Sequence, residues 1–211
     1  MSGTDGLRIG SLCSGYGGLD LGVQDVLGGS VVWHCEIDAN AAAILAHHWP
    51  GVPNLGDLSA VDFDQVEPVD VVTAGFPCQD VSLAGRRAGL TEGTRSGLWL
   101  HVTRAIQSLR PRLVVIENVR GLLSATAHSH VESCSWCVGD ASAEPPLRAL
   151  GAVLGDLASL GYDAEWACVR ASEIGAAHRR ERVFIAARPI ADANGDIRAG
   201  RDRSQGKARA A

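Results

Sequence analysis

The chain has 211 residues, of which 46% are hydrophobic and 20% are charged, and its formal net charge is −5 at pH 7. This composition excludes global disorder, and the length allows a sizeable buried core without disulfides or metals. No apolar run reaches the ~18 residues of a membrane span, and the first residues do not resemble a signal peptide, so we expect no membrane contact and reduced cysteines.

Strand and helix patterns alternate along the chain. Apolar runs typical of strands fall at 7–12, 31–37, 70–75, 113–116, 162–169 and 182–187, and helical spacing falls at 19–27, 40–49, 98–109 and 147–160. This order predicts an α/β fold, a mostly parallel twisted sheet with helices on both faces and a final antiparallel strand pair. Ligands of such sheets bind beyond the carboxyl ends of the strands.

A glycine-rich turn, Ser14-Gly15-Tyr16-Gly17-Gly18, follows the first predicted strand. Its glycines permit a tight turn and a close approach of backbone to a ligand. Glu36 ends the next predicted strand, about 20 residues further on, where a carboxylate can accept hydrogen bonds from ribose hydroxyls. Because the turn is not GxGxxG, the pair favours a ribose-bearing cofactor for which phosphate is not required.

Pro77-Cys78-Gln79 follows the strand predicted at 70–75. A thiolate there would be a strong nucleophile, and Pro77 restricts the backbone that carries it. The alternative is a buried structural cysteine. The following loop, Asp80–Ser96, is rich in Arg and Gly and favours the nucleophile, because such a loop suits closure over a phosphate backbone.

Two further segments carry charge beside predicted strands. Glu117-Asn118-Val119 follows the strand at 113–116, so burial should raise the pKa of the Glu117 carboxyl and suit it to donate a proton. Arg180 and Arg182 stand at alternate positions before and in the last strand and can point into one site. Taken singly, each segment could equally be a strand cap or a solvated charge cluster.

Taken in order, these segments resemble the bacterial and phage DNA (cytosine-5) methyltransferase family. The glycine turn, Glu36-Ile37 and Gly56-Asp57-Leu58 resemble its cofactor motifs, and Pro77-Cys78-Gln79, Glu117-Asn118-Val119 and Arg180-Glu181-Arg182 match its catalytic motifs. The resemblance implies a Rossmann-like fold and methyl transfer from S-adenosylmethionine to carbon 5 of a flipped cytosine in double-stranded DNA. It also implies a cytoplasmic, nucleoid-associated protein.

The resemblance implies a role for each matching residue. Cys78 would attack carbon 6 of the base, Glu117 would protonate or hydrogen-bond ring nitrogen 3, Arg180 would bind the base carbonyl, and Arg182 would orient Glu117 or contact phosphate. The cofactor would lie against Cys13, Gly15, Gly17, Gly18, Glu36, Ile37, Asp57, Leu58, Pro77 and Leu98. DNA would contact Gln79, Ser82, Arg86, Arg87, Arg95 and His178. Two positions depart from the family pattern: Cys13 replaces a usual Phe, and His178 a usual Gln.

The family continues beyond the point where this sequence ends. We expect residues 1–190 to form the catalytic and cofactor-binding domain and residues 191–211 to be a flexible tail or the start of a target recognition region. The recognition domain and last cofactor motif would come from a second polypeptide or a missing segment. Without them we expect weak, salt-sensitive DNA binding and little turnover.

Other interpretations stay open at this point. His128, His130, Cys134 and Cys137 form a His-x-His…Cys-x-x-Cys cluster that could hold zinc, which would suit an interaction module with a degenerate enzyme body. The chain could also be half of a split methyltransferase, or methylate cytosine in tRNA. A nicotinamide-dependent oxidoreductase is disfavoured, because GxGxxG is absent and Pro77-Cys78-Gln79 would have no role.

Overall fold

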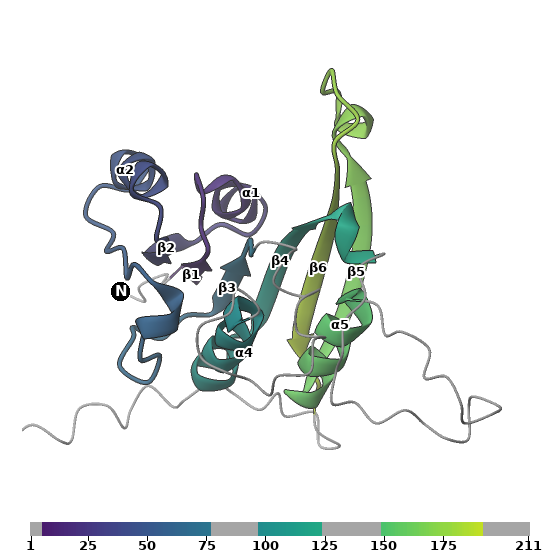
Figure 1. Ribbon diagram of the computed structural model, residues 1–211. Helices are drawn as coiled ribbons and strands as arrows, with labels where there is room; N and C mark the ends of the chain where they lie inside the picture. The colour runs from purple at the N-terminus through teal and green to yellow at the C-terminus, as the bar shows by residue number, and fades with distance from the viewer. Residues whose placement is uncertain (1–5, 77–96, 124–148, 192–211) are drawn as a thin grey trace, which may run out of the picture.

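A computed structural model describes residues 6–76, 97–123 and 149–191 (Figure 1). The predicted cysteine nucleophile, the loop after it, the histidine–cysteine cluster and the tail lie outside these ranges. The elements are β1 (Arg8–Leu12), α1 (Gly18–Leu27), β2 (Ser30–Cys35), α2 (Ala39–His48), η1 (Leu58–Ala60), β3 (Val71–Ala74), α4 (Gly97–Leu109), β4 (Leu113–Val119), η3 (Arg120–Leu123), α5 (Ala149–Ser159), β5 (Tyr162–Arg170), η4 (Ala171–Ile174) and β6 (Glu181–Pro189).

The strands form one six-stranded sheet in the order β2-β1-β3-β4-β6-β5. β1 pairs in parallel with β2 and β3, and β3 pairs in parallel with β4. β6 runs antiparallel to both β4 and β5. The predicted parallel sheet with a final antiparallel pair is confirmed. Because the chain leaves β1 toward β2 and returns on its other side as β3, the crevice of such a sheet opens at the carboxyl ends of β1 and β3.

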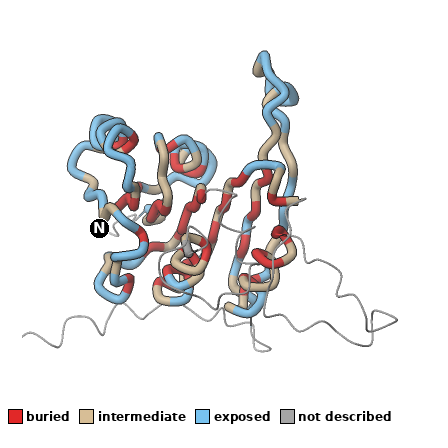
Figure 2. The backbone as a smooth tube through the Cα atoms, in the orientation of Figure 1, coloured by how far each residue is buried: buried red, intermediate tan, exposed pale blue. Residues whose placement is uncertain are grey.

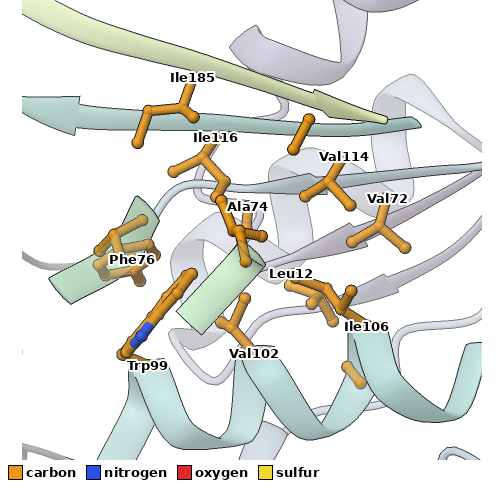
Figure 3. Close-up of a cluster of buried hydrophobic side chains, with 14 of the residues drawn as sticks. Leu12, Val72, Ala74, Phe76, Trp99, Val102, Ile106, Val114, Ile116 and Ile185 are labelled. Carbon is orange, nitrogen blue, oxygen red and sulfur yellow. The ribbon is translucent and has the colours of Figure 1, made fainter. Parts of the chain in front are cut away.

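Helices pack on both faces of the sheet (Figure 1). Val23 of α1 packs with Ile9 and Val71 on one face. The larger core lies on the other face, where α4 and α5 cover alternate residues of the strands. Figure 3 shows this core, in which Trp99, Val102 and Ile106 of α4 meet Leu12, Val72, Ala74, Phe76, Val114, Ile116 and Ile185. Figure 2 shows that the strands are buried where helices cover them and exposed where β5 and β6 extend beyond the body of the protein.

Local sequence explains where the first helices begin and end. α1 starts after Gly17, which has φ 78°, a conformation that glycine adopts without steric cost. A Cβ on Gly17 would lie 2.5 Å from the Trp49 ring, so this position has no room for a side chain. α2 begins at an Asp38 cap, whose Oδ1 accepts hydrogen bonds from the N–H groups of Asn40 and Ala41.

The structure corrects one predicted boundary near the site. Glu117-Asn118-Val119 were expected to follow a strand, but they form the last three residues of β4, because they pair with residues 182–184 of β6. Among the helices of the described ranges, none has the length and apolar character needed to cross a membrane.

Candidate active site

The glycine turn after β1 and the acid after β2 meet, as the sequence predicts. The Gly15 N–H donates a hydrogen bond to Glu36 Oε2 at 2.7 Å, and the Asp38 N–H donates to Oε1 at 2.8 Å. Gly15 has φ 54°, and an added Cβ there would meet no atom within 4 Å. The turn therefore presents open backbone beside a carboxylate whose two oxygens are held in place.

Asn54 fixes the backbone around Glu36 and was not found by sequence reasoning. Its Nδ2 donates to the Glu36 carbonyl at 2.9 Å, and its Oδ1 accepts from the N–H groups of Glu36 and Gly56, at 3.0 and 3.2 Å. The neighbouring Ile37 is 74% exposed, so an aliphatic surface is available next to the carboxylate. An isolated Asn in a polar loop gives no periodic pattern, which is why the sequence did not indicate it.

The next predicted cofactor segment lies around η1. Asp57 Oδ1 accepts hydrogen bonds from the N–H and the hydroxyl of Ser59, both at 2.8 Å, and these bonds hold the pKa of Asp57 below its usual value. Leu58 is buried, and Leu98 at the start of α4 is half-buried against the same core. Asp57 is therefore the exposed polar group of this segment.

Glu117 forms the second half of the site with the arginine of β6. Arg182 Nε lies 2.5 Å from Glu117 Oε1, across the β4–β6 pairing. Burial raises the pKa of Glu117, as predicted, although the charge of Arg180 opposes this shift. Arg180 and His178 are exposed and precede β6. The carboxyl is thus partly desolvated, yet it faces cationic groups that can stabilise its ionised form.

Gly75 lies between the two halves. A Cβ on Gly75 would be 3.3 Å from the Cys13 carbonyl oxygen and 3.9 Å from Glu117 Oε2. Cys13 itself has φ 50°, and its side chain is half-buried. The cofactor turn, the end of β3 and the predicted acid therefore converge at one edge of the sheet.

Asn118 is a second residue whose part the sequence did not predict. It is 2% exposed, its Nδ2 donates to the Phe76 carbonyl at 2.9 Å, and its Oδ1 accepts from the Val119 N–H at 2.8 Å. Phe76 stands two residues before Cys78 in the chain. Asn118 therefore anchors the backbone from which the predicted nucleophile follows.

Replacing Asn118 with Ala should destabilise the protein by about 1–3 kcal/mol, because the buried Phe76 carbonyl and the partly buried Val119 N–H each lose their side-chain partner. Asn40→Ala, at an exposed position of α2, is the matched control and should change the free energy of unfolding by less than ~0.5 kcal/mol. Urea denaturation of both variants measures the difference. Equal stability of the two variants would contradict this assignment.

The remaining predicted site residues fall outside the described ranges: Pro77, Cys78, Gln79, Ser82, Arg86, Arg87 and Arg95. The same holds for the candidate zinc ligands His128, His130, Cys134 and Cys137. Within the described ranges, no three His, Cys, Asp or Glu side chains gather as metal ligands would. Both sets remain predictions.

These features define an α/β protein that places a candidate nucleoside-cofactor site beside a partly desolvated acid. The sequence profile of the C-5 cytosine-specific DNA methylase family matches residues 7–189. The chain belongs to this family, as the motifs predicted.

Individual relatives support the assignment. The chain is 31% identical over 154 residues to the type II methyltransferase M.NgoBV of Neisseria gonorrhoeae, covering 73% of this chain and 33% of the relative. It is 33% identical over 182 residues to the type II methyltransferase M.HgiBI of Herpetosiphon aurantiacus, covering 84% and 36%. The chain thus spans about a third of the length of these two relatives.

Solved structures agree on the fold. The Dnmt2 methyltransferase of Schizosaccharomyces pombe superposes with a TM-score of 0.62 at 20% identity, covering 87% of this chain and 49% of that one. The methyltransferase EhMeth of Entamoeba histolytica superposes with a TM-score of 0.64 at 17% identity, covering 88% and 53%. The chain therefore shares the Rossmann-like α/β fold of these two methyltransferases, and the predicted fold class is confirmed.

Proposed function

We propose that this chain is the catalytic part of a DNA methyltransferase that transfers a methyl group from S-adenosylmethionine to carbon 5 of cytosine. The observation that carries the proposal is the convergence at Gly75, where the cofactor turn and the Glu117–Arg182 pair approach the same short segment. Cys78 follows that segment by three residues. This reaction requires a nucleophile, an acid and a bound methyl donor close together, which are the proposed roles of Cys78, Glu117 and the glycine turn.

The residues around the turn fit S-adenosylmethionine. Open backbone at Gly15 and Gly18 leaves room for the methionine part, Glu36 offers carboxylate oxygens to ribose hydroxyls, and the exposed Ile37 offers an apolar surface to adenine. Asp57 and the backbone of Leu58 would hold the adenine edge, and Cys13, Gly17, Pro77 and Leu98 would complete the pocket. When bound, the cofactor supplies an activated methyl group.

Cys78, Glu117 and Arg180 would act on the base. The Cys78 thiolate forms a bond to carbon 6, and the electron pair of the 5,6 double bond moves into the ring, which makes carbon 5 nucleophilic. Glu117 gives its proton to ring nitrogen 3, or donates a hydrogen bond there, and so offsets the developing charge. Arg180 binds the base carbonyl, while Arg182 orients Glu117 through the ion pair. Once carbon 5 has gained the methyl group, loss of its proton to water would restore the double bond and release the Cys78 thiolate, and the proton on ring nitrogen 3 would return to Glu117.

DNA recognition would be shared between this chain and a further segment. Gln79, Ser82, Arg86, Arg87, Arg95 and His178 would contact DNA near the flipped base. A target recognition domain and a last cofactor motif would come from a second polypeptide or a segment outside this sequence, with residues 1–190 as the catalytic domain and 191–211 leading toward that region.

The methylated base is the direct test of this proposal. One relative, from Escherichia phage P1, is named a DNA N-6-adenine-methyltransferase and is 30% identical over 218 residues, covering 28% of its length. The Pro77-Cys78-Gln79 motif favours cytosine, because methylation of an exocyclic amine requires no attack on the ring. Mass spectrometry of nucleosides from DNA treated with the chain and a polypeptide that supplies the target recognition domain should detect 5-methylcytosine. Detection of N6-methyladenine alone would refute the proposal.

S-Adenosylmethionine should bind the chain and NAD should not, because the turn lacks the GxGxxG pattern that binds the phosphates of a dinucleotide. Glu36→Gln should weaken S-adenosylmethionine binding by about tenfold, since it removes the charge from a hydrogen-bonding carboxylate. The same substitution at Glu165, an exposed residue of β5, should leave binding unchanged. Titration calorimetry measures the binding of both molecules to the parent chain and of S-adenosylmethionine to the two variants. Binding of NAD without S-adenosylmethionine would overturn the cofactor assignment.

A further inference from the structure

A buried carboxylate, that of Asp20, lies under the glycine turn. Asp20, in the first turn of α1, is 1% exposed. The Ser11 hydroxyl of β1 donates to its Oδ2 at 2.8 Å, and the Thr73 hydroxyl of β3 donates to its Oδ1 at 2.5 Å. Within the described ranges no ion pair involves Asp20. Its carboxylate is therefore satisfied by neutral hydroxyls and not by a cation.

Burial raises the pKa of Asp20 to about 6, although both hydroxyl hydrogen bonds lower it. At pH 8 the carboxyl is therefore ionised in almost every molecule. An ionised group held in a poorly solvated place destabilises the fold relative to a neutral group of the same shape. The position of Asp20 in the first turn of α1 offsets part of this cost, because a helix N-terminus favours a negative charge, and the same charge can act on a ligand that binds nearby.

The position of Asp20 connects this charge to the cofactor turn. Ser11 stands two residues before Cys13, and its carbonyl accepts a hydrogen bond from the Ser14 hydroxyl at 3.2 Å. The Ser14 carbonyl in turn accepts from the Gly17 N–H at 2.9 Å. Thr73 stands two residues before Gly75, where the halves of the site converge. The carboxylate thus lies beneath the segments that would line the cofactor pocket, and it is itself almost entirely shielded from solvent.

A methyl donor and its product differ in charge at one atom. The sulfonium of S-adenosylmethionine is positive, whereas the thioether of S-adenosylhomocysteine is neutral. A buried negative charge attracts the first and is indifferent to the second, and the attraction is stronger where water is excluded. We propose that Asp20 is a charge-selecting residue of the cofactor site, whose carboxylate favours the cationic methyl donor over the product. This inference rests on the proposed function, because it presumes that the turn binds this cofactor.

Two substitutions separate the charge of Asp20 from its hydrogen bonds. Asp20→Asn removes the charge and keeps a planar group that can both accept and donate, whereas Thr73→Val keeps the charge and removes one hydrogen bond. Calorimetric titration of the chain at pH 8 with S-adenosylmethionine and S-adenosylhomocysteine gives the affinity ratio. We expect Asp20→Asn to weaken methyl-donor binding by about three- to tenfold and to change product binding by less than about twofold. Thr73→Val should preserve the ratio of the parent chain.

The possible results distinguish this inference from the proposed function. If Asp20→Asn weakened the binding of donor and product equally, Asp20 would only stabilise the structure of the turn. If it changed the affinity for neither molecule, its charge would not act on the cofactor. Either result overturns the inference. If the parent chain binds neither molecule, the proposed function itself fails. Thermal unfolding at pH 8 provides a fold control, because a cooperative transition above the temperature of the titration shows that Asp20→Asn is folded when binding is measured.

A second measurement needs no variant. An analogue with an ammonium-bearing carbon in place of the sulfonium keeps the positive charge without the methyl donor chemistry. We expect the parent chain to bind this analogue at least about threefold more tightly than S-adenosylhomocysteine. The reverse order of affinity would overturn the inference even if Asp20→Asn failed to fold.

Discussion

When the chain is complemented with a polypeptide that supplies the target recognition domain and the last cofactor motif, Cys78→Ser is expected to reduce methyl transfer to DNA by at least about a thousandfold. A serine hydroxyl is almost never ionised at neutral pH, whereas a thiol ionises readily and its anion is a strong nucleophile. Transfer of tritiated methyl groups to mixed-sequence DNA at ~0.15 M salt measures the loss. DNA with 5-fluorocytosine at the target should trap a covalent complex with the parent chain, because the fluorine cannot leave as a proton does.

Cys168→Ser is the matched control for this experiment. Cys168 is a half-buried free thiol of β5 that the proposed mechanism does not use, so the same substitution there should leave methyl transfer and trapping close to those of the parent chain. A covalent complex that forms equally well with Cys78→Ser would remove Cys78 from its assigned role. Loss of trapping in both variants would point to damaged folding, which thermal unfolding would reveal.

Glu117→Gln is expected to slow methyl transfer by about a hundredfold or more, because an amide cannot supply a proton to the ring nitrogen. Burial raises the pKa of Glu117, so the protonated form persists to higher pH than for an exposed glutamate. The rate of the parent enzyme should therefore fall as pH rises through this raised pKa, as the acid loses its proton. The Gln variant should lack this fall, since its side chain does not titrate.

Glu165→Gln makes the same chemical change at an exposed carboxylate, 82% accessible and paired with Arg188 on the surface of the sheet. Its rate and pH profile should match those of the parent chain. If Glu117→Gln retained full activity, Glu117 would have no part in catalysis. If it lost activity but kept the alkaline fall in rate, another group would be the titrating acid.

The sequence predicted the fold class, a mostly parallel sheet with a final antiparallel pair, because the information for it was local. Apolar runs alternated with helical spacing, which specifies a parallel sheet, and two adjacent strand patterns at the end of the chain specified an antiparallel pair. The approach of Glu36 to the glycine turn was predictable for the same reason, since both follow parallel strands and must reach the same edge.

What could not be predicted depended on pairing and burial across long distances in the chain. Glu117-Asn118-Val119 are polar enough to suggest a loop, yet β6 keeps them extended. Asp20 sits where an acid commonly favours a helix N-terminus at the surface, and only the positions of Ser11 and Thr73 show that it is buried. Asn118 likewise acquires its role from a carbonyl 42 residues away.

Because β6 lies between β4 and β5, the Glu117 side of the site can form only late in synthesis. β5 leaves the ribosome before the strand that joins it to the rest of the sheet, and β4 keeps an open edge until β6 is inserted. The Glu117–Arg182 pair therefore forms only after about nine-tenths of this sequence has been translated. Early folding intermediates would contain the glycine turn without Glu117, the proposed catalytic acid, held in place. A chain that ended before Glu181 would leave β4 unpaired on one side, and its exposed edge would favour aggregation over a partly active enzyme.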